Sequence, residues 1–245
     1  MSPERTKRTS KTPRRRRAKR DSSRPADYET SSDLQGVHRV AGVDTSAAIT
    51  QRRAEVARAG RTGDEKTVRS FIDDAAGRVR FAVLAALVGL SAVGPEDVRR
   101  ALNDEDATVR RDACELGARL PGANFVPLLD DEDAAVVEAA AFALGEVADP
   151  AGVPRLCEIA MSHPDALCRE AAVAALGAIG DVAGKNVILH GLNDVPAIRR
   201  RAVIAAAVFD TADAKEAVLA HRDDRDWQVR QAVEDILGIS GEGHH

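Results

Sequence analysis

Residues 163–177 read HPDALCREAAVAALG, and this stretch decides the fold because it recurs along the chain. An acidic turn leads into an apolar anchor residue, an arginine often follows, and an alanine-rich segment ends the unit. A fixed period of about 30 residues is typical of solenoid proteins. The other copies are DDAAGRVRFAVLAAL (73–87), DEDATVRRDACELGA (104–118), DDEDAAVVEAAAFALG (130–145), NDVPAIRRRAVIAAA (193–207) and DDRDWQVRQAVEDILG (223–238). The anchors are Val79, Val109, Val136, Cys168, Ile198 and Val229, separated by 30, 27, 32, 30 and 31 residues.

Each copy is predicted to form the second helix of a helical hairpin. Apolar residues follow each anchor at offsets of three, four, seven and eight, which is the spacing of one buried helical face. In the copy at 163–177 these residues are Ala171, Ala172, Ala175 and Leu176. A shorter helix is predicted before each turn, at 64–72, 95–102, 125–129, 152–161, 184–192 and 212–221. The alanine runs lack the alternation of a β-strand, so the pattern favours six helical hairpins.

The segments outside the repeats differ in composition. Residues 46–59 have the pattern of one more amphipathic helix, which we expect to cap the first repeat. We therefore expect a basic arm and linker over 1–43, a solenoid over 44–240 with repeats at about 63–238, and a flexible C-terminus over 241–245.

The net charge of −4 conceals a strong division along the chain. Residues 1–25 hold eleven basic and two acidic residues, which gives +9, and the rest of the chain carries −13. The arm has no apolar residues for a core, so we expect it to be disordered. Its densest basic residues are Arg14, Arg15, Arg16, Arg17, Lys19 and Arg20. Three interpretations stay open: attachment to nucleic acid or ribosomes, contact with an anionic membrane surface, or contact with the acidic solenoid itself. A solvated leader without any specific partner is a fourth.

Composition narrows the cellular setting. The sequence has no run of 18 apolar residues and no apolar segment near its start, so neither a membrane span nor a signal peptide is predicted. Three cysteines cannot form a disulfide framework, which favours a reducing cytoplasm. Arginine outnumbers lysine by 29 to 6, which suggests a GC-rich and therefore bacterial gene.

The recurring D-x-D-x-x-V-R-x-A-A-x-A-L-G pattern resembles HEAT-like repeats, in particular the short subtype first named in phycobilin lyases. Residues 163–177 and 223–238 match it best. The copies also depart from it: Leu116–Gly117 comes one place early, Val137 stands where arginine is usual, and the fifth copy ends in three alanines. The resemblance implies an all-α, right-handed solenoid. Proteins built this way include adaptors, chromophore lyases, a diiron hydroxylase and alkylpurine glycosylases, so it does not select a function.

The sequence lacks the residues that the enzyme alternatives require. A diiron site of the hydroxylase kind needs His-Glu pairs, and no His-Glu dipeptide occurs. A glycosylase needs a catalytic carboxylate beside aromatic residues, and Asp226–Trp227 is the one place in the repeats where an aspartate is directly followed by an aromatic residue. We interpret Asp226 as a residue at a helix start and Trp227 as packing in the turn over the previous repeat.

The remaining polar patterns are interpreted as structural. The acidic turns are expected to cap helices, and the arginines that follow the anchors are expected to form an Asp–Arg ladder between neighbouring turns. Cys114 and Cys168 occupy core positions and are expected to be buried thiols. No catalytic residues, cofactor or metal site are predicted. The arginines of the series are Arg80, Arg110, Arg169, Arg199 and Arg230.

The positions left for binding a partner are on the inner face of the second helices, at offsets of two and six from each anchor. We expect the partner-binding residues there, with Phe81 and Phe142 either exposed as anchors or tilted into the core. The candidates are Phe81, Arg111, Glu138, Phe142, Glu170 and Arg200. The leading hypothesis is a monomeric, non-catalytic protein-interaction scaffold. A nucleic-acid-associated protein held by residues 1–25 is the alternative, and a lyase or glycosylase is the third.

Overall fold

The computed structural model describes residues 45–238, and within this range the chain forms helices and no strands. The predictions for the arm and for the extreme C-terminus therefore lie outside the described residues. The α-helices are α1 (Ser46–Thr62), α2 (Glu65–Arg69), α3 (Gly77–Gly89), α4 (Pro95–Leu102), α5 (Ala107–Leu116), α6 (Ala134–Val147), α7 (Val153–Ser162), α8 (Ala166–Ile179), α9 (Lys185–Gly191), α10 (Pro196–Ala206), α11 (Ala212–Leu219) and α12 (Trp227–Leu237).

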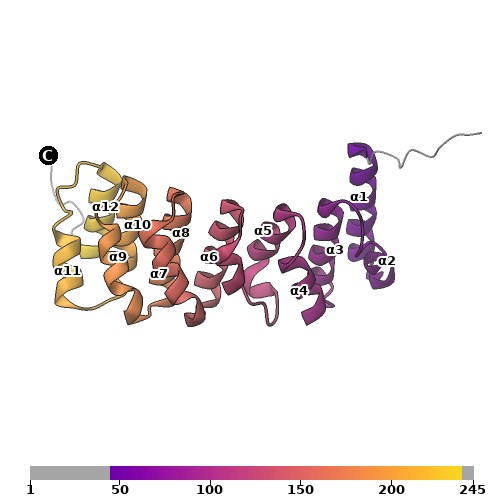
Figure 1. Ribbon diagram of the computed structural model, residues 1–245, viewed down its shortest axis with the longest axis horizontal. Coiled ribbons are helices and arrows are strands. Elements are labelled where there is room, and N and C mark those ends of the chain that lie inside the picture. The colour runs from indigo at the N-terminus through magenta and orange to yellow at the C-terminus, as the bar shows by residue number, and fades with distance from the viewer. Residues whose placement is uncertain (1–44, 239–245) are drawn as a thin grey trace, which may run out of the picture. The chain divides into compact units, whose positions relative to one another are not determined.

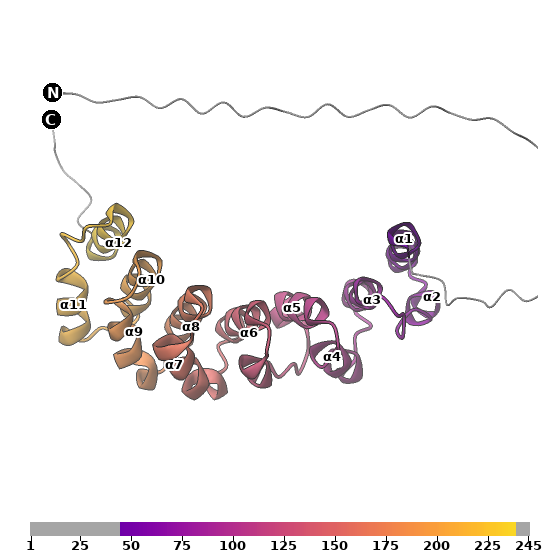
Figure 2. The ribbon, with the colours of Figure 1, turned by 45° about the horizontal axis from the view of Figure 1, so that its top comes forward.

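Six hairpins are stacked side by side along the chain (Figure 1). Their second helices form one layer, α3, α5, α6, α8, α10 and α12, and their first helices form the other (Figure 2). The stack bends toward the second helices, so these line its inner side (Figure 2). The predicted all-α solenoid of six hairpins is confirmed.

One hairpin differs from the prediction of a regular first helix. The segment before α6 forms a short 3₁₀ helix, η2 (Val126–Asp130), with Pro127 in its first turn. Short segments of this length often form the tighter 3₁₀ turn, and α2 with its five residues shows that a short first helix is tolerated in this fold.

The anchors confirm the assignment of the core. All six are buried, with at most 2% of the residue exposed. The face is rotated slightly from the predicted one, because Ala139 and Ala171, three residues after their anchors, are only partly buried. Residues at offset five, Ala141 and Val173, are fully buried instead. This rotation turns a row of small side chains toward the inner surface.

Aspartates in the turns start the second helices. Asp106, Asp133, Asp165 and Asp226 each accept a hydrogen bond from the backbone N–H two residues further on. A side-chain acceptor at this position satisfies one of the unpaired N–H groups of a helix start. The predicted capping role of the acidic turns is confirmed at these four residues.

A second set of turn aspartates forms the predicted ladder. Each ladder arginine donates through Nε and Nη2 to both carboxylate oxygens of an aspartate in the next turn, and through Nη1 to a carbonyl of its own turn. Arg199 shows the geometry: it reaches Asp224 at 2.9 and 2.8 Å and the carbonyl oxygen of Asp194 at 2.8 Å. The steps are Arg80–Asp104, Arg110–Asp131, Arg169–Asp194 and Arg199–Asp224, and Arg52 of α1 adds Asp74.

Arg230 ends the series. Its Nη1 donates to the carbonyl oxygen of Asp224 at 2.7 Å, as in the other steps. No further turn follows it within the described residues, so the ladder stops at α12.

The ladder skips one step in the middle. Val137 holds the arginine position on α6, and His163 holds the aspartate position in the next turn. Both charges are replaced together, which avoids an unpaired charge at a buried site, where Val137 is 2% exposed. A ladder aspartate also accepts a hydrogen bond from a backbone N–H of its own turn, as Asp104 does from Asp106. His163 keeps this second role, since its Nδ1 accepts from the N–H of Asp165 at 3.1 Å.

Glycines bring the other ends of the second helices close together. A Cβ atom added to Gly145 of α6 would lie 3.1 Å from the Cα of Ala175 on α8, and one added to Gly177 would lie 2.8 Å from the Cα of Ala205. The Ala-Leu-Gly ending thus permits a close approach that any larger side chain would prevent.

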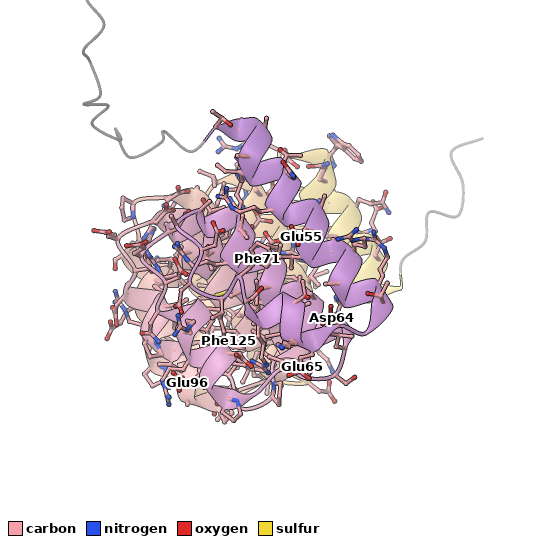
Figure 3. The ribbon with its side chains drawn as sticks, turned by 90° about the vertical axis from the view of Figure 1, so that its right-hand side faces the viewer. Glu55, Asp64, Glu65, Phe71, Glu96 and Phe125 are labelled. Carbon is pink, nitrogen blue, oxygen red and sulfur yellow. The ribbon has the colours of Figure 1, made fainter. Side chains whose placement is uncertain are left out.

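The N-terminal end of the described chain is closed by α1. Val56 and Ala59 of α1 are buried in a cluster with Val79 and Val83 of α3. Figure 3 shows α1 in front of this end, with Asp64 and Glu65 at the start of α2 below it. The additional helix predicted at 46–59 covers the first hairpin.

We predict that the missing ladder step can be restored. Val137→Arg alone should lower the free energy of unfolding by several kcal/mol, because it places an unpaired cation at a buried site. Adding His163→Asp should recover about 1–3 kcal/mol of that loss by pairing the charge. Denaturant unfolding of the wild type, both single variants and the double variant measures this coupling. Additive losses in the double variant would show that the two positions do not face each other.

The ladder also predicts a dependence of stability on pH. Hydrogen bonds from arginine hold the pKa values of Asp131, Asp194 and Asp224 below the ordinary value of 3.8. The unfolded state therefore binds more protons than the folded state at acid pH. The free energy of unfolding should be constant above about pH 5 and fall as the pH drops below about 4.

Denaturant titrations between pH 3 and pH 7 test this expectation. Arg169→Gln, which removes one pairing, should give a shallower acid decline than the wild type. Arg222→Gln, at an exposed residue with no ion pair among the described residues, is the control and should follow the wild type. An identical decline in Arg169→Gln would mean that the ladder does not cause it.

Candidate partner-binding groove

A groove of about 420 Å³ lies on the inner layer, across α5, α6, α8 and α10. Its floor is made of alanines, because the rotated core face exposes small residues there. Two large apolar side chains and five charged ones stand around this floor. The floor consists of Ala135, Ala139, Ala171 and Ala174, and the other lining residues are Arg111, Glu115, Glu138, Phe142, Leu167, Glu170 and Arg201.

Two apolar side chains in the groove are held out in solvent. Phe142 of α6 is 58% exposed and Leu167 of α8 is 56% exposed. Each lies on a helix whose other apolar residues are mostly buried, so the exposure is specific to these positions. A partner that covers them would remove apolar area from water, at about 25 cal/mol per Å².

Ion pairs hold most of the charges around the groove. Glu170 faces two arginines of α10, with oxygen–nitrogen distances of 3.5 Å to Arg201 and 3.9 Å to Arg200. Arg111 pairs with Asp112 and lies 3.8 Å from Glu115. Glu138 has no ion pair among the described residues. Most charged side chains around the groove are therefore paired, and the carboxylate of Glu138, beside Phe142, is without an ion pair in the described residues.

Four predicted residues come together here, and two lie elsewhere. Arg111, Glu138, Phe142 and Glu170 line the groove. Arg200 contacts it through Glu170 and lines a neighbouring hollow. Phe81 is not in the groove: it is partly buried and packs against the core, which matches the second of its two alternatives.

Sequence reasoning missed several residues of this surface. Leu167 comes just before its anchor, in the first turn of α8, a position outside the offsets used for the prediction. Arg201 follows its anchor by three places, where a core residue was expected. Ile204 and Trp227 face a second hollow of about 310 Å³ between α10 and α12. Trp227 is 64% exposed and is not packed away in its turn as expected.

Asp226 and the two buried cysteines, whose side chains could take part in catalysis, have structural positions. Asp226 caps α12 and accepts from the N–H groups of Gln228 and Val229. Burial raises the pKa of the Cys114 thiol to about 12 and that of Cys168 to about 11, which disfavours the reactive thiolate. Within residues 45–238, no group of three or more His, Cys, Asp or Glu residues is placed to hold a metal ion. In the same range no helix has the length and apolarity needed to cross a membrane.

Comparison with known proteins gives a family match. Residues 122–206 match the family model of HEAT repeats. Among solved structures, human deoxyhypusine hydroxylase in complex with glycerol is 17% identical, with a TM-score of 0.41 over 80% of this chain and 81% of that chain. A designed armadillo repeat protein in complex with the peptide (KR)4 is 15% identical, with a TM-score of 0.43 over 78% and 91% of the two chains. No curated protein matches this sequence.

The two candidate phenylalanines should respond differently to truncation. Phe142→Ala should change the free energy of unfolding by less than about 0.5 kcal/mol, because the ring is exposed. Phe81→Ala should lower it by about 2 kcal/mol or more, because the ring packs against the core. Thermal and denaturant unfolding of both variants provide the measurement. A large loss in Phe142→Ala would place its ring in the core and remove it from the groove.

Proposed function

Because this chain is a HEAT-like repeat protein, we propose that it acts as a non-catalytic scaffold that binds a protein partner in the groove. The observation that carries the proposal is the exposure of Phe142 and Leu167 above a floor of alanines. Soluble proteins rarely leave neighbouring large apolar side chains exposed without a binding role. Aromatic residues at the centre of an interface carry a large share of the binding energy.

The shape of the groove favours a protein segment over a small molecule. The groove crosses four helices and continues toward the hollow around Trp227, with Arg200 and Glu170 between the two. Small-molecule sites enclose most of their ligand, whereas this surface is an open strip. A chain segment laid along it would cover Phe142 and then Trp227. We place this interaction in the cytoplasm of a bacterial cell, on the cysteine and arginine usage of the sequence.

The basic arm supports a second candidate function. Residues 1–25 carry +9, and such a segment attracts nucleic acid independently of sequence. Residues 45–238 carry 23 basic and 32 acidic residues, a net −9, which repels a phosphate backbone. A nucleic acid would therefore be held by the arm alone and not by the groove. The scaffold function is preferred because the groove offers apolar anchors that a phosphate backbone does not use.

Capture from a lysate of the source cells tests the scaffold function. Phe142→Ala/Leu167→Ala should reduce the amount of captured partner at least tenfold, because two central apolar contacts are lost. Val208→Ala/Leu219→Ala is the matched control, since it removes two exposed apolar side chains outside the groove. It should capture the same partner as the wild type. Equal capture by the groove variant would contradict the proposal.

A further inference from the structure

Helix α6 carries three side chains in a column: Glu138 and Phe142 line the groove, and Glu146 follows one turn later, outside the groove lining, with its carboxylate beside Gly117. Glu138, Phe142 and Glu146 are spaced four residues apart, and residues at this spacing lie one above the other on a helix. Neither glutamate has an ion pair within residues 45–238. The column therefore presents a carboxylate, an exposed ring and a second carboxylate in sequence.

This order of groups suits arginine side chains. A guanidinium group stacks on the face of an aromatic ring and at the same time donates paired hydrogen bonds to a carboxylate. Its aliphatic stem covers apolar surface such as Leu167. A segment with several consecutive arginines would satisfy both glutamates and cover the ring.

We propose that the groove is the docking site of the chain's own residues 14–20, RRRRAKR, with arginines on Phe142 and paired with Glu138 and Glu146. The inference rests on the proposed function and adds its regulation, because a docked arm competes with a protein partner for Phe142. Phosphorylation among the arm's serines and threonines would weaken the docking by adding negative charge.

Charge complementarity supports this occupant. Six of the seven residues in 14–20 are basic, and the described residues have a net charge of −9. Most ladder aspartates are already neutralised by arginines, as at Asp224. Glu138 has no ion pair within residues 45–238, so the groove offers one unpaired carboxylate beside Phe142, and Glu146 adds a second unpaired carboxylate outside the groove lining.

The length of the chain allows the contact. Arg20 and the start of α1 at Ser46 are 26 residues apart, which at full extension span about 85 Å. The groove on α6 is three steps along the inner layer from α1, through α3 and α5. Packed helices are 8–10 Å apart, so the distance to be crossed is about 30 Å. The linker is therefore long enough for residues 14–20 to reach the groove of their own chain.

A labelled peptide of residues 11–25, KTPRRRRAKRDSSRP, tests the docking in the full-length protein. Fluorescence anisotropy at 50 mM salt compares its Kd for the wild type with that for Arg14→Gln/Arg15→Gln/Arg16→Gln/Arg17→Gln. A tethered segment has an effective concentration on the order of 1 mM. An arm that binds the groove with a Kd of about 0.1 mM therefore raises the apparent Kd of the free peptide roughly tenfold. The neutralised arm should therefore bind the peptide about tenfold more tightly than the wild type.

Variants in the neutralised-arm background locate the site. Glu138→Gln/Phe142→Ala should weaken the peptide at least fivefold. Glu216→Gln/Leu219→Ala on α11, which also removes one exposed carboxylate and one exposed apolar side chain, is the matched control and should bind as before. Raising the salt to 500 mM should remove most of the binding, because exposed charges are screened.

Three results would overturn the inference. Equal peptide affinity for the wild type and the neutralised arm would show that the arm does not occupy the groove. Equal affinity for the groove variant and its control would show general attraction to the acidic surface. A wild-type arm that shifts a DNA duplex while leaving the groove open to the peptide would assign the arm to nucleic acid instead.

Failure of the proposed function has a different signature. If lysate capture is unaffected by Phe142→Ala/Leu167→Ala while the peptide results hold, the arm docks in the groove and the scaffold function fails. If capture depends on the groove but the wild type and the neutralised arm bind the peptide equally, the scaffold stands and the docking fails.

Discussion

The bidentate contact between an arginine of one hairpin and an aspartate of the next holds the repeats in register. Each contact joins consecutive turns at the start of the second helices, and the same aspartate organises its own turn by accepting a backbone N–H, as Asp104 does from Asp106. An apolar interface alone tolerates sliding, whereas a paired guanidinium has one geometry. The cost of burying these charges requires every member to be paired, and the replacement of both partners at Val137 and His163 follows this requirement.

The ladder has a second consequence, for the inner surface. Four of the arginines that follow the anchors, Arg80, Arg110, Arg169 and Arg199, are each paired with an aspartate and are therefore not free to bind a partner's anionic groups. The close contact of Gly145 with Ala175 adds a fixed point at the other end of the helices. Held at both ends, the second helices present an even floor of alanines, and the few larger side chains stand above it.

The proposed function rests on those larger side chains and not on the fold. Asp226 caps α12, and the thiols of Cys114 and Cys168 are buried. Phe142 with Leu167, and Trp227 with Ile204, give two apolar hollows along one face, separated by charges that are mostly paired. This arrangement is suited to an extended partner, and the unpaired carboxylate of Glu138 makes the groove suited to a cationic one.

The sequence by itself determined the period, the hairpins, the buried anchors, the caps and the Asp–Arg pairing. These depend on spacing within 30 residues and on the chemistry of residue pairs, which the repeats display six times. It located Arg111, Glu138, Phe142 and Glu170 on the inner face for the same reason. Only the tertiary structure decided that Phe81 packs inward while Phe142 stays exposed, and that Leu167 and Trp227 join the surface. Equivalent positions in the repeats look alike in sequence, but their exposure depends on the exact rotation of each helix against its neighbours. That rotation is set by the packing of side chains from three hairpins at once, which no single repeat encodes.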